Sequence, residues 1–454
     1  MILSINILNK FVLKITTILL TLSLPLSCSY FEDEQSNQSN FNSSSNNLNN
    51  INNINPSLFR IKGKVWSPGA DDETILPSNK FPIQGALVAA YPYEPDPPPS
   101  RYYCNECVKI GQDVIYTMSG DDGSFQLNLN PDTDYYLLVQ KGMFRRLTLY
   151  HTGNAGDLRI FDSKNEWTAK ETRFTLPNTH NPDEGKWIPR ILIIVGRGEP
   201  YMNIPFRAMG FVYNIDFEQI DDQEAEYVAG NIEELKKYSI ILVTCGDETP
   251  FLTKSKVKES LQEYVKGGGK LFIDDFAYDW AEQPFPEFMS FVVDYPIDYE
   301  QGVCALQNSP PDIIGKCVNY SCYNPQGTVK DESLAAWLKH VHPYSELSLE
   351  YGCNIIHELR PSLQGECNNP EDAECIDGNK YAKPKVWITG SWLEYTEKPL
   401  IISWDYYCGK VLYTVLHIHA HGNTLGGYEL ITQEKMMMHL LLEIQTCKEP
   451  EIIE

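Results

Sequence analysis

The chain has 454 residues, and 37 Lys and Arg against 61 Asp and Glu give it a formal net charge of −24. At about 100–200 residues per domain, this length predicts two or three domains. Because so acidic a chain would repel nucleic-acid phosphates, we exclude nucleic acid as a partner. Only one apolar stretch approaches membrane-spanning length, which excludes a multi-pass membrane protein.

Residues 1–28 are typical of a secretory signal peptide, in which two lysines precede a 12-residue apolar segment from Ile15 to Leu26. A spanning helix would need about 20 such residues. The segment ends in the letters LPLSC at Cys28, which resemble the lipobox of bacterial lipoproteins, although Pro25 stands where Leu is usual. The resemblance implies that Cys28 is lipidated and anchors the chain, most simply at the outer membrane. Secretion without a lipid is the alternative.

Residues 29–56 are predicted to be a disordered tether, because ten of the 19 residues from Asn37 to Asn55 are Asn.

Eleven cysteines follow Cys28, and in an exported chain they indicate disulfides. Their odd number leaves at least one thiol outside any intramolecular bridge, for which Cys245 is the best candidate.

Residues 57–177 have the pattern of a small β-sandwich, with short alternating strands and turns. The predicted strands are 59–66, 82–91, 114–118, 124–127 and 134–141, with Gly123 in the turn before the fourth. The motifs IKGKVWSP, PIQGALV and DGSFQL resemble the carboxypeptidase regulatory-like, transthyretin-like sandwich. Modules of that family are not catalytic. Cys104 and Cys107 form a C-x-x-C in a Pro-rich loop, and we expect a local disulfide between them rather than a redox or zinc site.

Residues 188–447 alternate strands and helices, which predicts a parallel sheet. Expected strands are 190–196, 212–217, 239–246 and 270–275, and expected helices are 201–209, 231–237 and 253–266. The segments ILIIVG, YSIILVTCGD, LQEYVKGGGKLFIDD and GKVLYTVLHIHAH resemble the class I glutamine amidotransferase-like, flavodoxin-related fold. That family carries a nucleophilic Cys on the elbow after the Gly-rich turn, but here the elbow reads Asp274-Asp275. Residues 296–384 form a Cys-rich insertion, either a lid or an elaboration without a ligand, with one helix at 333–340.

Candidate chemistry gathers where the parallel strands end, since ligands bind at the carboxyl edge of such sheets. We expect Gly196, Cys245 and the Asp274-Asp275 pair to converge there. One of the two aspartates would face the cleft as a general base or metal ligand, or would cap the next helix. Cys245 is read as a nucleophile only if a base lies beside it, and otherwise as a buried residue.

His417, His419 and His421 recur at every second position of the late strand, which places all three imidazoles on one face. Three imidazoles with a neighbouring Asp could hold Zn²⁺. The alternative is a half-exposed face on which His is tolerated.

The resulting fold prediction is an N-terminal β-sandwich followed by a flavodoxin-related parallel-sheet domain with an insertion. The missing elbow Cys favours a non-catalytic lipoprotein that binds or scaffolds envelope proteins. A metal-dependent hydrolase built on the histidines and an elbow Asp is the second hypothesis. Carbohydrate or peptidoglycan recognition through exposed aromatic residues is the third; its candidates are Tyr102, Tyr103, Trp280, Trp387 and Trp392.

Overall fold

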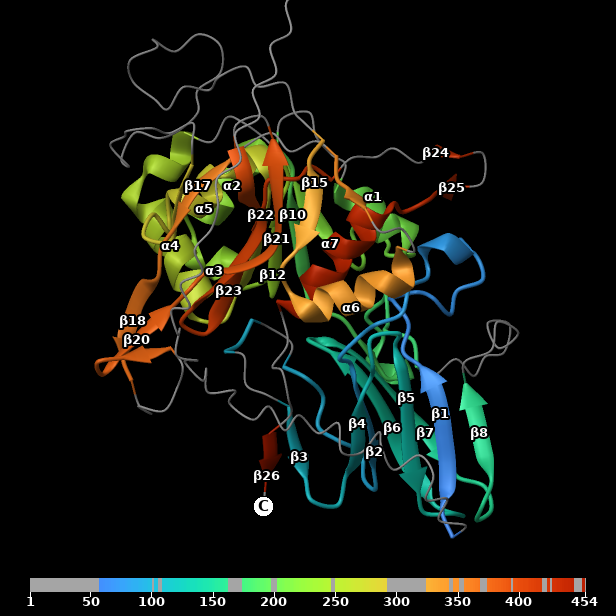
Figure 1. Ribbon diagram of the computed structural model, residues 1–454. Coiled ribbons are helices and arrows are strands. Elements are labelled where there is room, and N and C mark those ends of the chain that lie inside the picture. The colour runs from blue at the N-terminus through green and yellow to red at the C-terminus, as the bar shows by residue number, and fades with distance from the viewer. Residues whose placement is uncertain are drawn as a thin grey trace, which may run out of the picture. The chain divides into compact units, whose positions relative to one another are not determined.

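The structure is a computed structural model. It describes residues 57–99, 102–104, 108–161, 174–196, 202–245, 250–291, 324–342, 346–350, 355–367, 374–392, 395–418, 423–424, 427–444 and 451–453. The predicted signal peptide, Cys28 and the tether lie outside these residues. Within them, no helix is both long and apolar enough to cross a membrane. The described chain combines mixed β-sheets with few helices, an α+β fold (Figure 1).

Two sheets form the N-terminal part. The three-stranded sheet has the order β5-β1-β8, and the five-stranded antiparallel sheet has the order β4-β2-β6-β7-β9. Their strands are β1 (Phe59–Lys64), β2 (Leu87–Tyr91), β4 (Ile115–Met118), β5 (Ser124–Leu129), β6 (Asp134–Lys141), β7 (Phe144–His151), β8 (Leu158–Phe161) and β9 (Lys186–Trp187). The first five of these confirm predicted strands. Alternate residues of β1 are buried, as its sequence pattern requires.

The C-terminal part is built on a nine-stranded mixed sheet of order β11-β10-β12-β13-β23-β22-β21-β15-β16. The first five strands are parallel and the remaining four pair antiparallel. They are β10 (Ile191–Ile194), β11 (Glu218–Ile220), β12 (Ile240–Val243), β13 (Lys270–Asp274), β15 (Gln326–Val329), β16 (Leu347–Ser348), β21 (Lys385–Trp392), β22 (Tyr395–Tyr406) and β23 (Gly409–Thr414). Every residue of β10, β12 and β13 is buried, as expected for strands covered on both faces.

Helices connect and cover these strands (Figure 1). They are α1 (Asn203–Ala208), α2 (Asp222–Ala229), α3 (Ile232–Leu235), α4 (Ser255–Lys266), α5 (Asp279–Glu282), α6 (Glu332–Val341) and α7 (Thr432–Glu443), with the 3-10 helix η7 (Asp275–Ala277) after β13. The remaining described strands form short pairings: β3 (Lys109–Gly111) with β26 (Glu451–Ile453), β14 (Met289–Phe291) with β17 (Ile356–Leu359), β20 (Asn379–Ala382) with β18 (Ser362–Glu366) and β19 (Cys375–Ile376), and β24 (Asn423–Thr424) with β25 (Gly427–Tyr428).

The predicted strand at 212–217 is wrong, because these residues form a tight loop. Asn214 has the left-handed φ of 60°, and the carboxylate of Asp216 accepts a hydrogen bond of 2.8 Å from the Val212 N–H. Ile215 is 74% exposed at the tip of the loop. The strand comes later, as β11, and α2 was not predicted.

Part of the predicted insertion belongs to the main sheet, since β15 pairs with β21 and β16 with β15. Its predicted helix is confirmed as α6. Cys367 and Cys375 form a disulfide within the insertion. Cys304, Cys317, Cys322 and Cys353 lie outside the described residues, as does Cys447.

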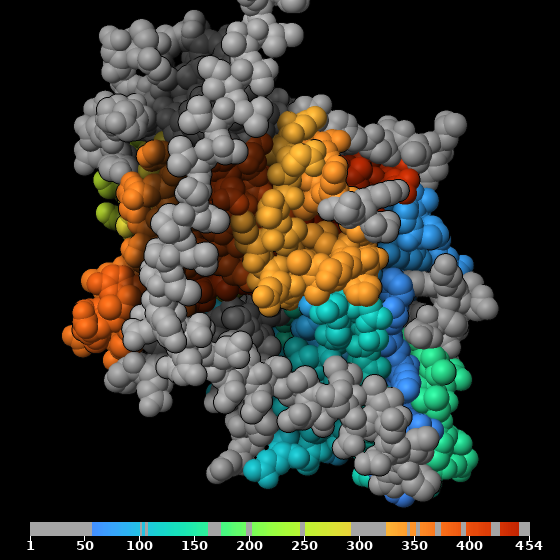
Figure 2. Space-filling model, in the orientation of Figure 1, coloured from blue at the N-terminus to red at the C-terminus, as the bar shows by residue number. Residues whose placement is uncertain are grey.

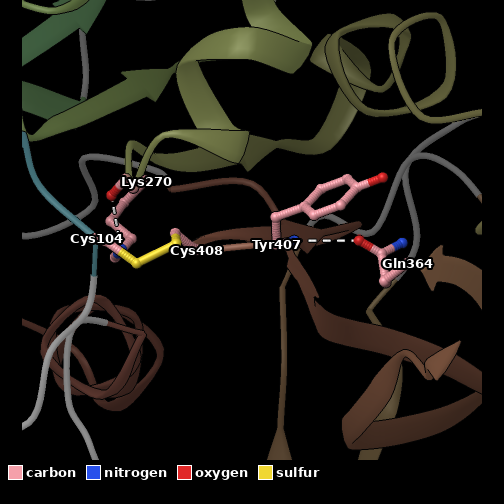
Figure 3. Close-up of a disulfide and its surroundings, with 6 residues drawn as sticks. Cys104, Lys270, Gln364, Tyr407 and Cys408 are labelled. Atoms are coloured by element: carbon pink, nitrogen blue, oxygen red, sulfur yellow. Dashed lines mark hydrogen bonds between the residues drawn. A yellow bond between two sulfur atoms is a disulfide. The ribbon is translucent and has the colours of Figure 1, made fainter. Parts of the chain in front are cut away.

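The predicted disulfide between Cys104 and Cys107 is wrong, because Cys104 is bonded to Cys408, 304 residues later (Figure 3). Cys408 lies in the turn between β22 and β23, next to Tyr407. The segment that carries Cys104 packs against the Gly-rich turn after α4. A Cβ on Gly268 would lie 2.0 Å from the Tyr103 carbonyl oxygen, so this close approach requires glycine.

Helix α6 joins the N-terminal strands to the nine-stranded sheet, and Figure 2 shows its surface against theirs. The Trp337 indole N–H donates a hydrogen bond of 2.7 Å to the Pro82 carbonyl oxygen. The same ring packs edge-on against Phe81 and is fully buried. A single apolar cluster therefore runs through both parts of the chain.

Candidate functional site

The candidate site lies where the parallel strands β12, β13 and β23 end. Cys245 comes two residues after β12, Asp274 is the last residue of β13, and His417 comes three residues after β23. Because parallel strands end at the same edge of the sheet, residues distant in sequence meet there. The predicted convergence of Cys245 with Asp274-Asp275 is confirmed.

Asp275 occupies the elbow between β13 and η7 in a strained conformation. Its φ is 43°, in the left-handed region, and its side chain is completely buried. Non-glycine residues enter this region at a cost, although Asp tolerates it better than most. The Tyr413 hydroxyl donates a hydrogen bond of 3.0 Å to the Asp275 carbonyl oxygen, which helps to hold the turn.

Three side chains meet at this elbow. The Asp275 Oδ2 lies 3.7 Å from the Cys245 Sγ and 3.6 Å from the His417 Nδ1. The three potential ligand atoms all lie within 4.8 Å of one another, and all three residues are buried. Cys245 is not part of a disulfide.

The two distances from the Asp275 carboxylate are close to those between ligands of one cation, although the Cys245 thiol also donates a hydrogen bond to that carboxylate. An N–H···O hydrogen bond has a donor–acceptor distance of about 2.7–3.2 Å, shorter than the His417–Asp275 separation. With Zn–S bonds of about 2.3 Å and Zn–N or Zn–O bonds of about 2.0–2.1 Å, tetrahedral ligand atoms lie about 3.3–3.5 Å apart. Cys, His and Asp are all ordinary ligands of zinc.

Asp274 borders the cluster from the same turn. Its Oδ2 accepts a hydrogen bond of 3.3 Å from the Ile418 N–H, while its Oδ1 is buried without a partner among the described residues. The pKa of Asp274 is raised to about 8, mainly by burial; the His417 charge opposes this rise and the Asp275 charge contributes to it.

Both predictions about the Asp pair need correction. Only one carboxylate was expected to face the cleft, but Asp275 is left-handed rather than extended, so the alternation of a strand ends before it. Both carboxylates consequently reach the segment of His417. A capping role is also wrong for Asp274, because it precedes η7 but makes no side-chain capping hydrogen bond.

The predicted row of three histidines is wrong for His417, since β23 ends at Thr414 and His417 follows in irregular backbone. The Gln433 side-chain amide donates a hydrogen bond of 2.8 Å to the His417 carbonyl oxygen and fixes this segment on α7. His419 and His421 lie outside the described residues. The grouping of His417 with Cys245 was not predicted.

The remaining candidates do not join this cluster. The Gly196 N–H donates to the Thr244 hydroxyl at 2.8 Å, which supports the reading of its loop as a turn. Trp280 and Trp387 are buried, and Tyr102 stacks on Tyr264. The Trp392 side chain lies outside the described residues. Buried tryptophans are not available to stack on a sugar, which counts against these two residues as a carbohydrate platform.

Comparisons with known proteins give structural likenesses only. No model of a known protein family matches the chain, and no curated protein matches it. A cytoplasmic protein of Salmonella typhimurium LT2 is 14% identical, with a TM-score of 0.33, over 56% of this chain and 99% of that one. A second cytoplasmic protein of Salmonella typhimurium is 13% identical, with a TM-score of 0.31, over 56% and 98%. A ThuA-like protein of Bacteroides uniformis is 12% identical, with a TM-score of 0.29, over 56% and 88%. Scores this low carry no argument about activity.

Proposed function

We propose that this chain is an exported metal-dependent hydrolase whose zinc ion is held by Cys245, Asp275 and His417. The observation that carries the proposal is the meeting of three ligand atoms within 4.8 Å at the elbow. Their position at the carboxyl edge of parallel strands, on a strained turn, is where α/β enzymes place reacting groups. The histidines of the sequence hypothesis thus contribute through His417, with Cys245 as a new ligand.

Three protein ligands leave one zinc position for water or substrate, the pattern of catalytic rather than structural zinc sites. Zinc there would polarise an ester or amide carbonyl and lower the pKa of a coordinated water. The protein's own contribution is to hold the ligands rigid. Asp275 is fixed by the elbow and by Tyr413, and His417 by Gln433.

We further propose that the chain is exported and anchored through a lipid on Cys28. The Cys104–Cys408 and Cys367–Cys375 disulfides support an oxidising compartment.

The domain assignment also stays a proposal: a regulatory-like sandwich over 57–177 and an amidotransferase-like domain over 188–447. The order β11-β10-β12-β13-β23 supports the second, because numbering these strands by chain order gives the flavodoxin pattern 2-1-3-4-5.

The test is the zinc content of the oxidised chain, residues 29–454, after stoichiometric zinc is added and the excess removed. We expect about one zinc per chain in the parent. The variants C245S, D275N and H417A should each weaken zinc binding at least tenfold. The matched control is H151A, which removes an exposed histidine that lies between Asp132 and Asp134 but belongs to no buried cluster. Thermal unfolding of each variant checks that it is folded.

Hydrolysis is measured separately on aryl ester and amide substrates, with and without a chelator. Activity that a chelator removes and zinc restores would support the hydrolase. Zinc binding without any hydrolysis would leave the metal site but overturn the enzyme. A folded parent that binds no zinc overturns the whole proposal and returns the chain to non-catalytic binding or scaffolding of envelope partners.

A further inference from the structure

A second site is suggested by a cavity of about 810 Å³ at the opposite edge of the sheet. It lies between the Pro-rich segment 94–99 and the first residues of β10 and β11, Ile191 and Glu218. These parallel strands begin at the cavity and run towards the carboxyl edge of the sheet, where the elbow of β13 lies, so the cavity is separate from the Cys245 cluster. Trp187 and Phe217 give it apolar walls.

The walls of this cavity are rich in hydrogen-bond acceptors and carry more carboxylates than cationic side chains, although His180, Asn214 and Trp187 also offer donors. Six prolines line it, and each offers a carbonyl oxygen but no N–H: Pro95, Pro97, Pro98, Pro99, Pro182 and Pro189. Three carboxylates also line it, on Glu94, Asp216 and Glu218. Arg190 supplies a positive charge, but its guanidinium pairs with Glu218 at 2.8 Å and lies 5.4 Å from the centre of the Tyr238 ring.

Asp216 is the group in these walls that most clearly needs a further partner. Asp216 is only 4% exposed, and its Oδ2 accepts a hydrogen bond of 2.8 Å from the Val212 N–H. Its Oδ1 is buried and has no hydrogen-bond partner among the described residues. A buried carboxylate oxygen without a donor is costly, which favours a ligand that supplies one.

We propose that this cavity binds an organic ammonium ion with an apolar body, its charged nitrogen donating to Asp216 and its hydrocarbon part lying against Trp187. An ammonium group supplies three donors and a positive charge, matching the acceptor-rich walls. An anion would meet an excess of carboxylates, and a neutral alcohol would leave that excess unbalanced.

The test is calorimetric titration of the oxidised chain with pentylammonium, and with 1-pentanol and pentanoate as probes of the same length. We expect pentylammonium to bind at least tenfold more tightly than either. In D216N the affinity for pentylammonium should fall at least tenfold, while the amide oxygen of Asn can still accept the Val212 N–H and preserve the loop. The control E224Q removes the same charge from an exposed position on α2 and should change the affinity less than twofold.

Any of four results would overturn the inference. The parent fails to bind pentylammonium, pentanol binds as tightly, or D216N retains the parent affinity with the parent's thermal stability. An equal loss of affinity in D216N and E224Q would also overturn it, because attraction to the acidic surface as a whole would then explain the binding. Zinc loading is measured in the same samples and should be unchanged in D216N.

Discussion

The side-chain oxygen of Asn79 accepts a hydrogen bond of 2.8 Å from the backbone N–H of Leu430, 351 residues later in the chain. The amide nitrogen of the same side chain donates to the Tyr428 carbonyl oxygen at 2.8 Å and to the Ala208 carbonyl oxygen at 3.3 Å. Asn79 is 1% exposed. One side chain thus satisfies three backbone groups in the C-terminal part of the chain.

Replacing Asn79 with Ala should therefore destabilise the chain by about 2–4 kcal/mol, since backbone groups lose partners in a buried place. The measurement is the free energy of unfolding in urea. Asn128, an exposed residue of β5, provides the control, and N128A should cost less than about 0.5 kcal/mol. Equal effects of the two substitutions would contradict the role given to Asn79.

The sequence was most informative for the strands whose pattern had a single explanation. The uninterrupted apolar runs of β10, β12 and β13 could only be buried strands, and the amphipathic spacing of α4 could only be a helix. The strand predicted at 212–217 was wrong because its apolar residues lie in a loop. There the Asp216 carboxylate, rather than a neighbouring strand, accepts the hydrogen bond of the Val212 N–H. That hydrogen bond is a tertiary detail that no periodicity reveals.

The site was predicted in its location but not in its membership. The rule for parallel strands placed Cys245 beside Asp275. The grouping with His417 depended on where β23 stops, and the alternation of VLHIHAH continued the strand past its real end at Thr414. The Cys104–Cys408 bond was equally hidden, because a C-x-x-C spacing suggests a local pair and the true partner lies 304 residues away.

A non-reducing peptide map should contain a disulfide-linked peptide pair with Cys104 and Cys408. The double variant C104S/C408S should lower the free energy of unfolding by about 2–5 kcal/mol, because the bond closes a very long loop in the unfolded chain. The matched comparison is C367S/C375S, whose loop spans 8 residues and should matter less. A map linking Cys104 to Cys107 would refute the pairing.

Lys141 on β6 and Glu443 on α7 form an ion pair of 2.5 Å, in which the Lys141 side chain is only 3% exposed. Burial opposes the charge of Glu443, but Lys141 and His439 hold its pKa below the ordinary value. K141M should cost about 1–3 kcal/mol, because it takes the lysine charge away from the partly buried Glu443 carboxylate, which keeps only its contact with His439 among the ion pairs described.

Two comparisons separate that pairing from simple packing. The double variant K141M/E443L removes both charges and should be more stable than K141M alone. K186M breaks the exposed pair of Lys186 with Glu184 and should cost less than about 1 kcal/mol. If K141M/E443L is less stable than K141M, the loss of stability in K141M does not come from the Glu443 charge that has lost its lysine.

The imidazole of His439 should make the stability depend on pH. It is 1% exposed and stacks on the Trp337 indole, with ring centroids 4.1 Å apart. Burial lowers its pKa to about 4, helped by the Lys141 charge and opposed by Glu443 and Asp331. In the unfolded chain the pKa returns to about 6.5. The unfolded state therefore binds a proton first as the pH falls, so the stabilisation is complete above about pH 6.5 and declines towards pH 4.

We expect the free energy of unfolding of the parent to fall by up to roughly 3 kcal/mol between pH 7 and pH 4 from this residue alone. H439F keeps an aromatic ring against Trp337 and removes the titration, so the difference between parent and H439F isolates His439 from the carboxylates that titrate in both. H151F is the control with the opposite sign. Hydrogen bonding to Asp134 raises the pKa of the exposed His151, so its stabilisation is present at low pH and lost as the pH rises. Parallel pH profiles for the parent and H439F would show that His439 takes up its proton equally in both states, contrary to its burial.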